Sequence, residues 1–333
     1  MAALDIPRLS PRLSVVVAIV SDTTGSPDTA HLEPCLKALD RLPSDVSTEI
    51  VVPFYPAVKG IAALKDRYPR VNFVEVTDLK TYTGRSGNRE HHDELRARGL
   101  AQARGEIVAL IEDHGIITPD WSTRLLAAHA GASAAVGGAI ENGIDRPLNW
   151  AVYFCDFLRY QNPLPEGETA IVSDANVAYK RIPLESVRPI WQEIFHESSV
   201  TAALRSKGQQ IVLAPAAVLH QHRMGLTVRS ALKERYVWGR SYAATRARLA
   251  RPAQRAFWAF FSPALPVLMM ARMTLMAWKK RRTFGAFLKA MPLTSALAVS
   301  WSCGEWVGYV TGRANSAGSQ AAEAIARGSR GAQ

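Results

Sequence analysis

The sequence contains little cysteine and no recognisable export signal. Its 333 residues include three cysteines, Cys35, Cys155 and Cys303, none in the C-x-x-C spacing of zinc or redox sites. This usage argues against a disulfide framework and fits a reducing compartment. The N-terminal sequence MAALDIPRLSPRLSVVV lacks a basic stretch followed by a long apolar run and a small-residue cleavage site. We therefore expect no secretory signal.

Acidic residues are nearly absent from one segment. Between Arg223 and Lys289 there are fifteen Lys or Arg residues and one acid, Glu234, so this segment carries +14 in a chain of net charge +11, and the rest sums to −3. Such a basic stretch is typical of contact with nucleic acid, phosphorylated ligands or an anionic membrane. Because it surrounds the most apolar part of the chain and contains no nucleic-acid motif, we expect a membrane surface as partner and no nucleic acid.

The longest apolar stretch runs from Ala256 to Trp278 and contains a single charge, Arg272. As one helix it would be about 34 Å long, enough to span a hydrocarbon core. Pro263 and Pro266 interrupt it, however, and both flanks are basic, which conflicts with a single span under the positive-inside rule. We expect this stretch to form re-entrant or interfacial helices that pair with the second apolar stretch, 287–310. The alternatives are up to two transmembrane helices, or a hairpin buried against the rest of the protein.

Apolar strand-like runs alternate with helical patterns in the first two-thirds of the chain. The strand runs lie at 14–20, 49–54 and 71–76, from Glu106 onward, and as a strand pair over 210–222. This alternation predicts right-handed βαβ units and an α/β fold with a mainly parallel sheet. Composition divides the chain into an N-terminal arm (1–12), an α/β domain (13–225), a basic and apolar helical region (226–312) and a tail (313–333) expected to be disordered.

The stretch from Asn88 to Trp121, NREHHDELRARGLAQARGEIVALIEDHGIITPDW, resembles the core signature of glycosyltransferase family 2. The matching positions are Arg96, Gly99, Ala103, Gly105, Glu106 and Pro119-Asp120-Trp121, and Glu112-Asp113-His114 stands where the family has D-x-D. A subset of family-2-like proteins has this Glu-Asp-His form. The resemblance extends discontinuously to His222. It implies a GT-A fold, which is Rossmann-like, and transfer of a sugar from a nucleotide-sugar donor.

The resemblance also implies a divalent cation, Mg²⁺ or Mn²⁺. The departing nucleotide diphosphate accumulates negative charge, and hard oxygen ligands at a strand end can hold a cation against it. Asp113 is the predicted direct ligand, and Glu112 and His114 are predicted as a second ligand or as outer contacts. His220 and His222, at the end of the last strand, stand where related enzymes can complete the metal site. The alternatives are a solvated turn for the acidic motif and ordinary surface or buried histidines.

A second element, WQEIFHESSVTAALRSKGQQIVLAPAAVLHQH (191–222), resembles the family's later signature. Glu197 falls where inverting members have the aspartate that removes the proton of the acceptor hydroxyl, and His196 falls where they have Glu. A glutamate can perform this general-base chemistry. The alternative is that Glu197 only complements the dipole of the helix that follows it.

Donor and acceptor contacts follow from the same resemblance. The aspartate that usually ends the second strand and contacts the base is missing, because Pro53 stands near its place. The predicted donor-binding residues are Asp22, Arg96, Glu112 and Asp113. The predicted acceptor-binding residues are Asp174 and Asn176, in SDANVAYKR, and Glu141 and Asn142, which follow a pair of glycines. Turns explain these four residues almost as well.

Together these features predict an inverting, metal-dependent transferase of hexosyltransferase type at the cytoplasmic face of the plasma membrane. Its acceptor would be lipid-linked or membrane-presented, in the synthesis of cell-envelope or polysaccharide glycans. The alternative is a catalytically silent relative that binds sugar or a partner at the membrane. A nucleotidyltransferase is disfavoured because the loop SDTTGSPDT after the first strand has no Lys or Arg.

Overall fold

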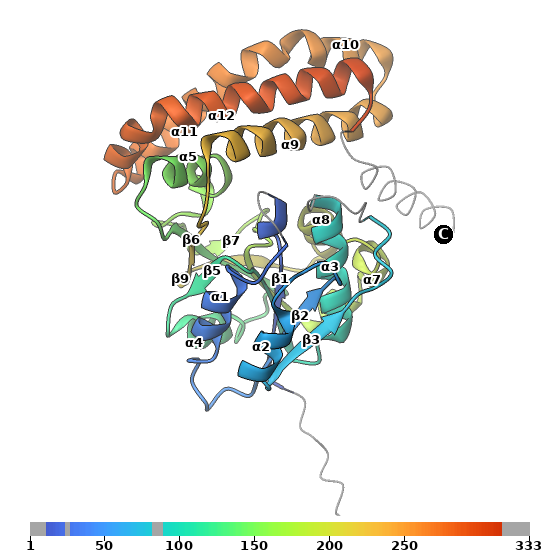
Figure 1. Ribbon diagram of the computed structural model, residues 1–333, viewed down its shortest axis with the longest axis vertical. Coiled ribbons are helices and arrows are strands. Elements are labelled where there is room, and N and C mark those ends of the chain that lie inside the picture. The colour runs from blue at the N-terminus through green and yellow to red at the C-terminus, as the bar shows by residue number, and fades with distance from the viewer. Residues whose placement is uncertain (1–10, 24–26, 82–88, 315–333) are drawn as a thin grey trace, which may run out of the picture.

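The computed structural model describes residues 11–23, 27–81 and 89–314. The predicted arm and tail lie outside these ranges except for residues 11, 12, 313 and 314. Figure 1 shows an α/β body and, above it, a layer of long helices from the C-terminal part of the chain. This arrangement confirms the predicted α/β fold with a C-terminal helical region.

Within the described residues, nine strands form one sheet in the order β3-β2-β1-β4-β8-β6-β9-β5, with β7 paired to β9. They are β1 (Leu13–Ala18), β2 (Thr48–Phe54), β3 (Val71–Glu75), β4 (Ile107–Glu112), β5 (Gly115–Ile117), β6 (Ala135–Asn142), β7 (Gly167–Glu168), β8 (Asn176–Lys180) and β9 (Ile211–Gln221). The four strands β3, β2, β1 and β4 are mutually parallel, as predicted. The other half is mixed, because β8 runs antiparallel to both β4 and β6.

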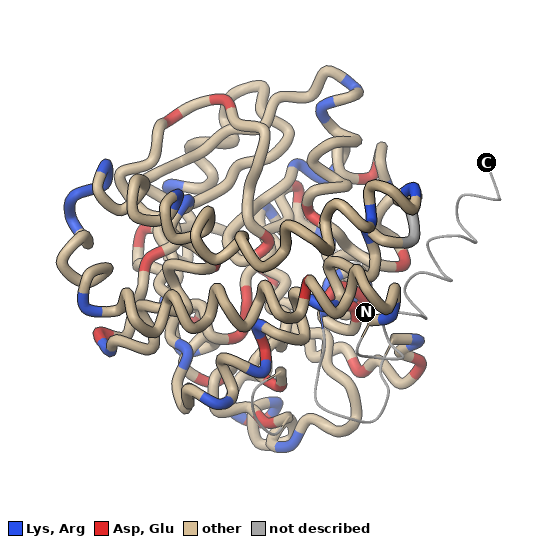
Figure 2. The backbone as a smooth tube through the Cα atoms, turned by 90° about the horizontal axis from the view of Figure 1, so that it is seen from above, with Lys and Arg blue, Asp and Glu red and all other residues tan. Residues whose placement is uncertain are grey.

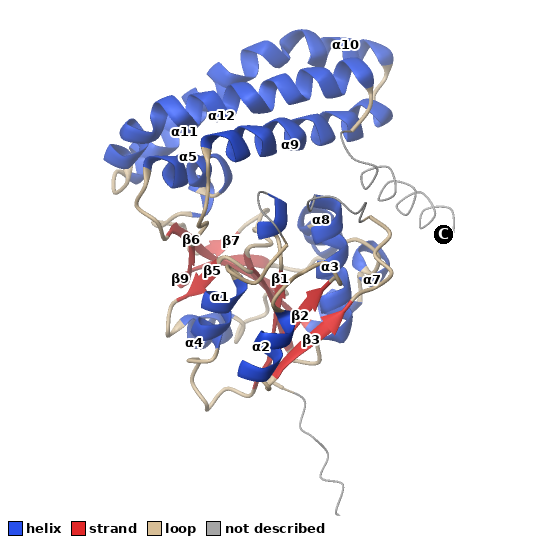
Figure 3. Ribbon diagram, viewed as in Figure 1, coloured by secondary structure: helices blue, strands red, loops and turns tan. Residues whose placement is uncertain are grey.

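Helices cover both faces of the sheet, as the secondary-structure colouring in Figure 3 makes clear. They are α1 (Leu32–Leu39), α2 (Ile61–Arg67), α3 (Arg89–Gln102), α4 (Trp121–Ala128), α5 (Pro147–Asp156), α6 (Arg181–Glu185), α7 (Arg188–Trp191) and α8 (Glu197–Ser206). The run LSVVVA of β1 is buried on both sides. Val15 and Val17 join the core shared with α1, α2 and α4, and Val16 joins the core shared with α3 and α8. This explains why the strand is continuously apolar rather than alternating.

The last part of the α/β body differs from the prediction. The expected strand pair over 210–222 is a single strand, β9, that pairs in parallel with β6. Its register shifts between Gly138 and Ala139, where Ala214 and then Val218 are the partners on β9. Pro215 lies in this irregularity, and it has no N–H to donate to the ladder there.

Four helices form the upper layer: α9 (Val228–Leu249), α10 (Pro252–Phe261), α11 (Leu265–Lys280) and α12 (Phe284–Thr311). Helix α12 packs along α9 and α5. Glycines allow this close approach, since a Cβ atom on Gly304 would lie 2.1 Å from the carbonyl oxygen of Tyr236, and one on Gly308 would lie 2.5 Å from that of Arg240. The second apolar stretch is therefore buried on one face, against α9 and α5, and exposed on the other.

Helices α10 and α11 instead lie on the outside. By length and composition alone, the segment Pro252–Lys280 is long and apolar enough to cross a membrane. Only 11% of its most apolar 18 residues are buried. Its exposed apolar residues include Phe257, Phe260, Val267, Leu275 and Trp278. Figure 2, which looks down on this layer, shows long tan stretches of helix with Lys and Arg gathered toward the ends. An apolar surface with basic ends is typical of contact with an anionic membrane.

Candidate functional site

A cavity of about 440 Å³ lies between the carboxyl ends of the parallel strands and the helical layer. One end is lined by residues of the α/β body: Val20, Thr23, Arg89, His92, Arg96, Glu112 and His114. The other end is lined by Cys155, Asp156, Phe157, Arg159, Tyr160, Arg223, Glu234, Trp238 and Trp301, and Val172, Ser173, Asp174 and Glu197 also line the cavity. We call these the strand end and the helix end. Ligand sites in open α/β sheets commonly lie at this edge.

Arg96 of α3 is the centre of the strand end. Its guanidinium contacts Asp93 at 2.8 Å, Glu112 at 3.0 Å and Asp174 at 3.2 Å. Burial alone would lower the pKa of Arg96, but the three carboxylates raise it above its usual value. Burial raises the pKa of Asp174, and the Arg96 charge only partly opposes this effect. The fold thus brings together three of the residues predicted from the sequence, namely Arg96, Glu112 and Asp174.

Glu112 and His114 form a second contact in this cluster. His114 Nε2 lies 3.2 Å from Glu112 Oε2, and the side chain of Gln221 donates to the same oxygen at 3.2 Å. Burial opposes charge on both groups, but their mutual contact and the Arg96 charge lower the pKa of Glu112 to about 2. Despite burial, the hydrogen bonds to Asp113 and Glu112 raise the pKa of His114 to about 9. Both side chains are therefore charged at neutral pH.

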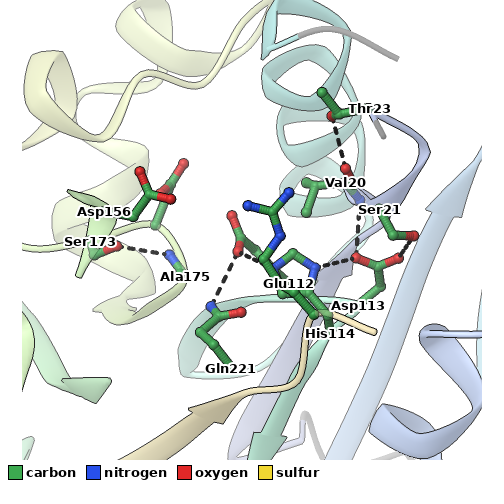
Figure 4. A network of polar contacts seen from close by, with 12 residues as sticks. Val20, Ser21, Thr23, Glu112, Asp113, His114, Asp156, Ser173, Ala175 and Gln221 are labelled. Atoms are coloured by element: carbon green, nitrogen blue, oxygen red, sulfur yellow. Dashed lines mark hydrogen bonds and ion pairs between the residues drawn. The ribbon is translucent and has the colours of Figure 1, made fainter. Parts of the chain in front are cut away.

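Asp113, the predicted direct metal ligand, does not line the cavity. Its carboxylate is fully buried and accepts hydrogen bonds from the Val20 amide, at 3.1 Å, and from the Ser21 hydroxyl. Figure 4 shows Asp113 directed toward Ser21 and Glu112 directed the other way, toward Gln221. Successive residues of an extended strand point to opposite sides, which explains the divergence. Asp113 holds the loop after β1, and Glu112 faces the cavity.

His220 and His222 are also not brought to the cavity. They alternate with Gln221 along the end of β9, and it is Gln221 that reaches Glu112. His220 lies near Glu141 and Arg282. His222 donates its amide to the carbonyl of His114 at 2.7 Å, but its side chain lines a separate pocket. The four predicted metal ligands thus do not converge on one point.

Asp22 lies in a different buried cluster. Its carboxylate accepts from the Tyr55 hydroxyl at 2.6 Å and contacts His92 Nε2 at 2.6 Å and His91 Nε2 at 3.4 Å. Among the described residues, Asp22, His91 and His92 form one group whose ligand atoms are close enough to hold a metal ion. Burial lowers the pKa of His91 to about 3, so this ring is neutral. Only His92 of the three lines the cavity.

Glu197 begins α8 and faces the cavity. Burial and the neighbouring Asp174 charge raise its pKa to about 6. The approach to α8 is fixed by Asp93, whose carboxylate contacts His196 Nδ1 at 3.0 Å and whose carbonyl accepts from the Phe195 amide at 3.0 Å. Asp93 also contacts Arg96, so the same residue connects the strand-end cluster to the start of α8.

Of the four predicted acceptor-binding residues, only Asp174 lines the cavity. Asn176 is fully buried and bridges the Ala139 and Ala217 carbonyls and the Trp121 indole, which occupies its whole amide. Glu141 accepts from the Asn162 amide and pairs with Arg282. Asn142 donates to the carbonyl of Ile144 at 2.7 Å. Strand packing and loop structure account for these three residues.

Sequence reasoning missed most of the helix end. Asp156 on α5, Trp238 on α9 and Trp301 on α12 belong to elements outside the family signature and carry no motif. Glu234 carried a usable signal, because it is the one acid in a segment with fifteen basic residues. A lone acid in such a stretch is expected to pair, and Glu234 pairs with Arg223 at 2.8 Å.

The chain matches no protein-family model and no curated protein sequence. Solved structures similar to it include a mannosyltransferase from Pyrobaculum calidifontis in complex with GDP-Man and Mn²⁺, with TM-score 0.47, 18% identity, and 97% of this chain and 88% of that chain covered. Another is S. aureus TarS (1-349), with TM-score 0.45, 13% identity, and 87% and 91% covered. A mycobacterial protein has TM-score 0.40, 16% identity, and 69% and 73% covered. At these values the similarities carry no conclusion about the substrate, metal or reaction of this chain.

Proposed function

We propose that this chain is an inverting glycosyltransferase that uses a nucleotide-sugar donor. One observation carries the proposal: Glu197, with its pKa raised to about 6, lines the same cavity as the charged cluster of Arg96, Glu112 and Asp174. A poised carboxylate and a charged cluster at the ends of parallel strands are the two parts that such a transfer needs. The resemblance of residues 88–121 to glycosyltransferase family 2 supports the same reaction.

The proposed reaction is a single displacement. The oxygen of the acceptor hydroxyl attacks the anomeric carbon, its proton passes to the Glu197 carboxylate, and the bond from that carbon to the diphosphate oxygen breaks. The anomeric configuration is inverted because attack and departure occur on opposite faces. Arg89 and the protonated His114, both lining the strand end, would stabilise the departing diphosphate electrostatically.

A divalent cation, Mg²⁺ or Mn²⁺, is part of the proposal. Glu112 and Asp174 fit such an ion, since their side chains are 12% and 23% exposed in the cavity and carboxylate oxygens are the ligands that these ions prefer. When bound, the cation would neutralise charge on the leaving diphosphate. Arg96 contacts both carboxylates and so holds them side by side. Asp113 would act indirectly, through the loop after β1.

A membrane-presented or lipid-linked acceptor completes the proposal. The helical layer forms one end of the cavity through Trp238 and Trp301, and its outer helices α10 and α11 carry the exposed apolar residues. A membrane lying against that layer would bring lipid-linked acceptors to the cavity. The proposed location is the cytoplasmic face of the plasma membrane, and the proposed role is the synthesis of cell-envelope or polysaccharide glycans.

The test is turnover of a nucleotide-sugar panel by the full chain in detergent, with Mg²⁺, with Mn²⁺ and with a chelator, measuring the nucleotide diphosphate released. We expect one donor to turn over, with the metal increasing the rate and Glu112→Gln abolishing that increase. The exposed loop variant Glu166→Gln serves as the control for removing a carboxylate elsewhere.

A catalytically silent, sugar-binding relative is the second candidate. The pairing of Asp22 with Tyr55 and His92 favours it, because this predicted donor-binding acid is not open to a nucleotide. Donor binding by calorimetry without any release of nucleotide, with or without membranes, would establish this candidate and exclude the transferase.

A further inference from the structure

The residue before Glu197 is held by α3 and not by its own helix. His196 is the N-cap of α8, a position usually taken by Ser, Thr, Asp or Asn, whose side chains accept from the first amides of the helix. The His196 side chain forms no such cap. Instead, its Nδ1 lies 3.0 Å from Asp93 Oδ2. The side chain at the start of α8 thus forms an ion pair with another element.

Asp93 holds this junction at two consecutive residues. Besides its contact with His196, its backbone carbonyl accepts from the amide of Phe195, which is fully buried, at 3.0 Å. Asp93 itself is 1% exposed, and its Oδ1 contacts Arg96 at 2.8 Å. A carboxylate fixed from the side of Arg96 therefore determines where His196 lies.

The same contacts lead back to the cavity from the other side. Arg96 contacts Asp174 at 3.2 Å, and the Asp174 charge acts on Glu197. Asp174 and Glu197 both line the cavity. Glu197 follows His196 directly, so a shift of His196 moves the backbone that carries the Glu197 carboxylate. A displacement of about 1 Å in a reacting group can cost about 10²-fold in rate.

We infer that His196 is a positioning residue which, through its contact with Asp93, holds Glu197 where it removes the proton of the acceptor hydroxyl. This inference rests on the proposed transferase function and adds a residue to its site. His196 stands where the resembling family has Glu, and a glutamate beside Asp93 would repel it. The contact therefore depends on the histidine of this chain.

A titration of the histidine rings by NMR, on the full chain, tests the contact without turnover. The charged groups of α3 that act on His196 are Asp93, Arg89 and Glu90. Burial lowers the pKa of His196, but the contact with Asp93 outweighs it and raises that pKa above the ordinary 6.5. Asp93→Asn should lower it again, and Glu166→Gln should not. The His196 signal is identified by its loss in His196→Asn.

Donor turnover tests what the contact does. His196→Ala should lower kcat about 10- to 100-fold and leave the donor KM nearly unchanged, because the base is displaced and the donor site is not. His196→Asn keeps an N–H that can donate to Asp93 and should recover part of the rate. Gln192→Ala, which alters an exposed residue just before this junction, is the matched control and should keep the full kcat.

The pH profile separates positioning from a general loss of structure. The His196 charge is present below its pKa and is lost as the pH rises through it. The kcat of the unaltered chain should therefore fall with a midpoint at the pKa that NMR gives for His196, toward the rate of His196→Asn. The His196→Asn profile should lack this fall and keep only one near the His114 pKa of about 9.

Full kcat in His196→Ala would overturn the inference and leave the proposed function standing. So would a His196 pKa that Asp93→Asn does not lower, or an alkaline fall that His196→Asn retains unchanged. Absence of donor turnover by the unaltered chain would count against the proposed function and, with it, against a role of His196 in the reaction. The NMR titration would then still show whether Asp93 holds His196.

Discussion

Glu197 combines the position and the acidity expected of a base. It begins α8, lines the cavity, and is near enough to Asp174 for that charge, with burial, to raise its pKa to about 6. The carboxylate must be ionised to accept a proton. Activity should therefore depend on pH near 6, above the range in which an ordinary glutamate loses its proton.

We predict that kcat/KM rises with pH below about 6 and then levels off, because the raised pKa keeps Glu197 protonated in acid. Glu197→Gln should lower kcat by about 10²- to 10⁴-fold without a comparable change in donor affinity. The measurements are pH–rate profiles and donor titration by calorimetry. Glu166→Gln is the control, and a profile for Glu197→Gln that keeps both the rate and the acid limb would contradict the assignment.

Asp113 should behave as a structural residue. Its carboxylate satisfies the buried amide of Val20 and the hydroxyl of Ser21, so Asp113→Ala leaves that amide unpaired at a cost of about 1–3 kcal/mol in the free energy of unfolding. Urea titration followed by circular dichroism measures this loss. Glu112→Gln should instead act mainly on the metal dependence of turnover. If Asp113→Ala were fully stable and lost only metal activation, Asp113 would be a ligand after all.

At the scale of single elements, the sequence predicted the parallel half of the sheet well. Runs such as SVVVAIV are apolar because the strand is buried on both faces, and local pattern alone reveals that. The mixed half was harder. Nothing local distinguishes the continuous β9 from two strands around Pro215, because the outcome depends on its pairing with β6.

The site was predictable only where a stretch of the sequence resembled the family. The resemblance identified Arg96, Glu112, Asp174 and Glu197, which line one cavity, but it could not tell which of the adjacent acids Glu112 and Asp113 faces that cavity. That depends on the pleat of β4 and the course of the loop after β1. The helix end depends on how α9 and α12 pack over the sheet, and such long-range packing leaves no short pattern in the sequence.

The contact between α9 and α12 depends on glycine. A Cβ atom on Gly304 would lie 2.1 Å from the Tyr236 carbonyl oxygen, so Gly304→Ala should force the helices apart and cost about 1–3 kcal/mol. Gly285, on the same helix, has nothing within 4 Å of its would-be Cβ atom. Gly285→Ala should therefore be neutral or stabilise by up to about 1 kcal/mol. Thermal unfolding in detergent compares the two, and equal effects would contradict this packing.

At the scale of the whole molecule, the uneven distribution of charge and hydrophobicity along the sequence corresponds to one part of the fold. The basic, apolar segment of the sequence folds into one layer, with α9 and α12 against the α/β body and α10 and α11 outside. The layer completes the cavity through α9 and α12, and it carries exposed apolar residues on α10 and α11.

This geometry predicts binding to membranes through α10 and α11. Phe260 is 78% exposed and Val267 is 75% exposed, so the double variant Phe260→Asp, Val267→Asp should weaken sedimentation with vesicles that contain phosphatidylglycerol by at least about tenfold. Binding should also fall in high salt, because the basic helix ends act through screened charges. The control is Ile182→Asp, which removes an apolar residue of similar exposure (84%) from α6, outside the helical layer. It should leave vesicle binding unchanged. Were both variants to bind as well as the unaltered chain, the apolar face would not be the membrane contact, and acceptors would have to reach Trp238 and Trp301 from solution.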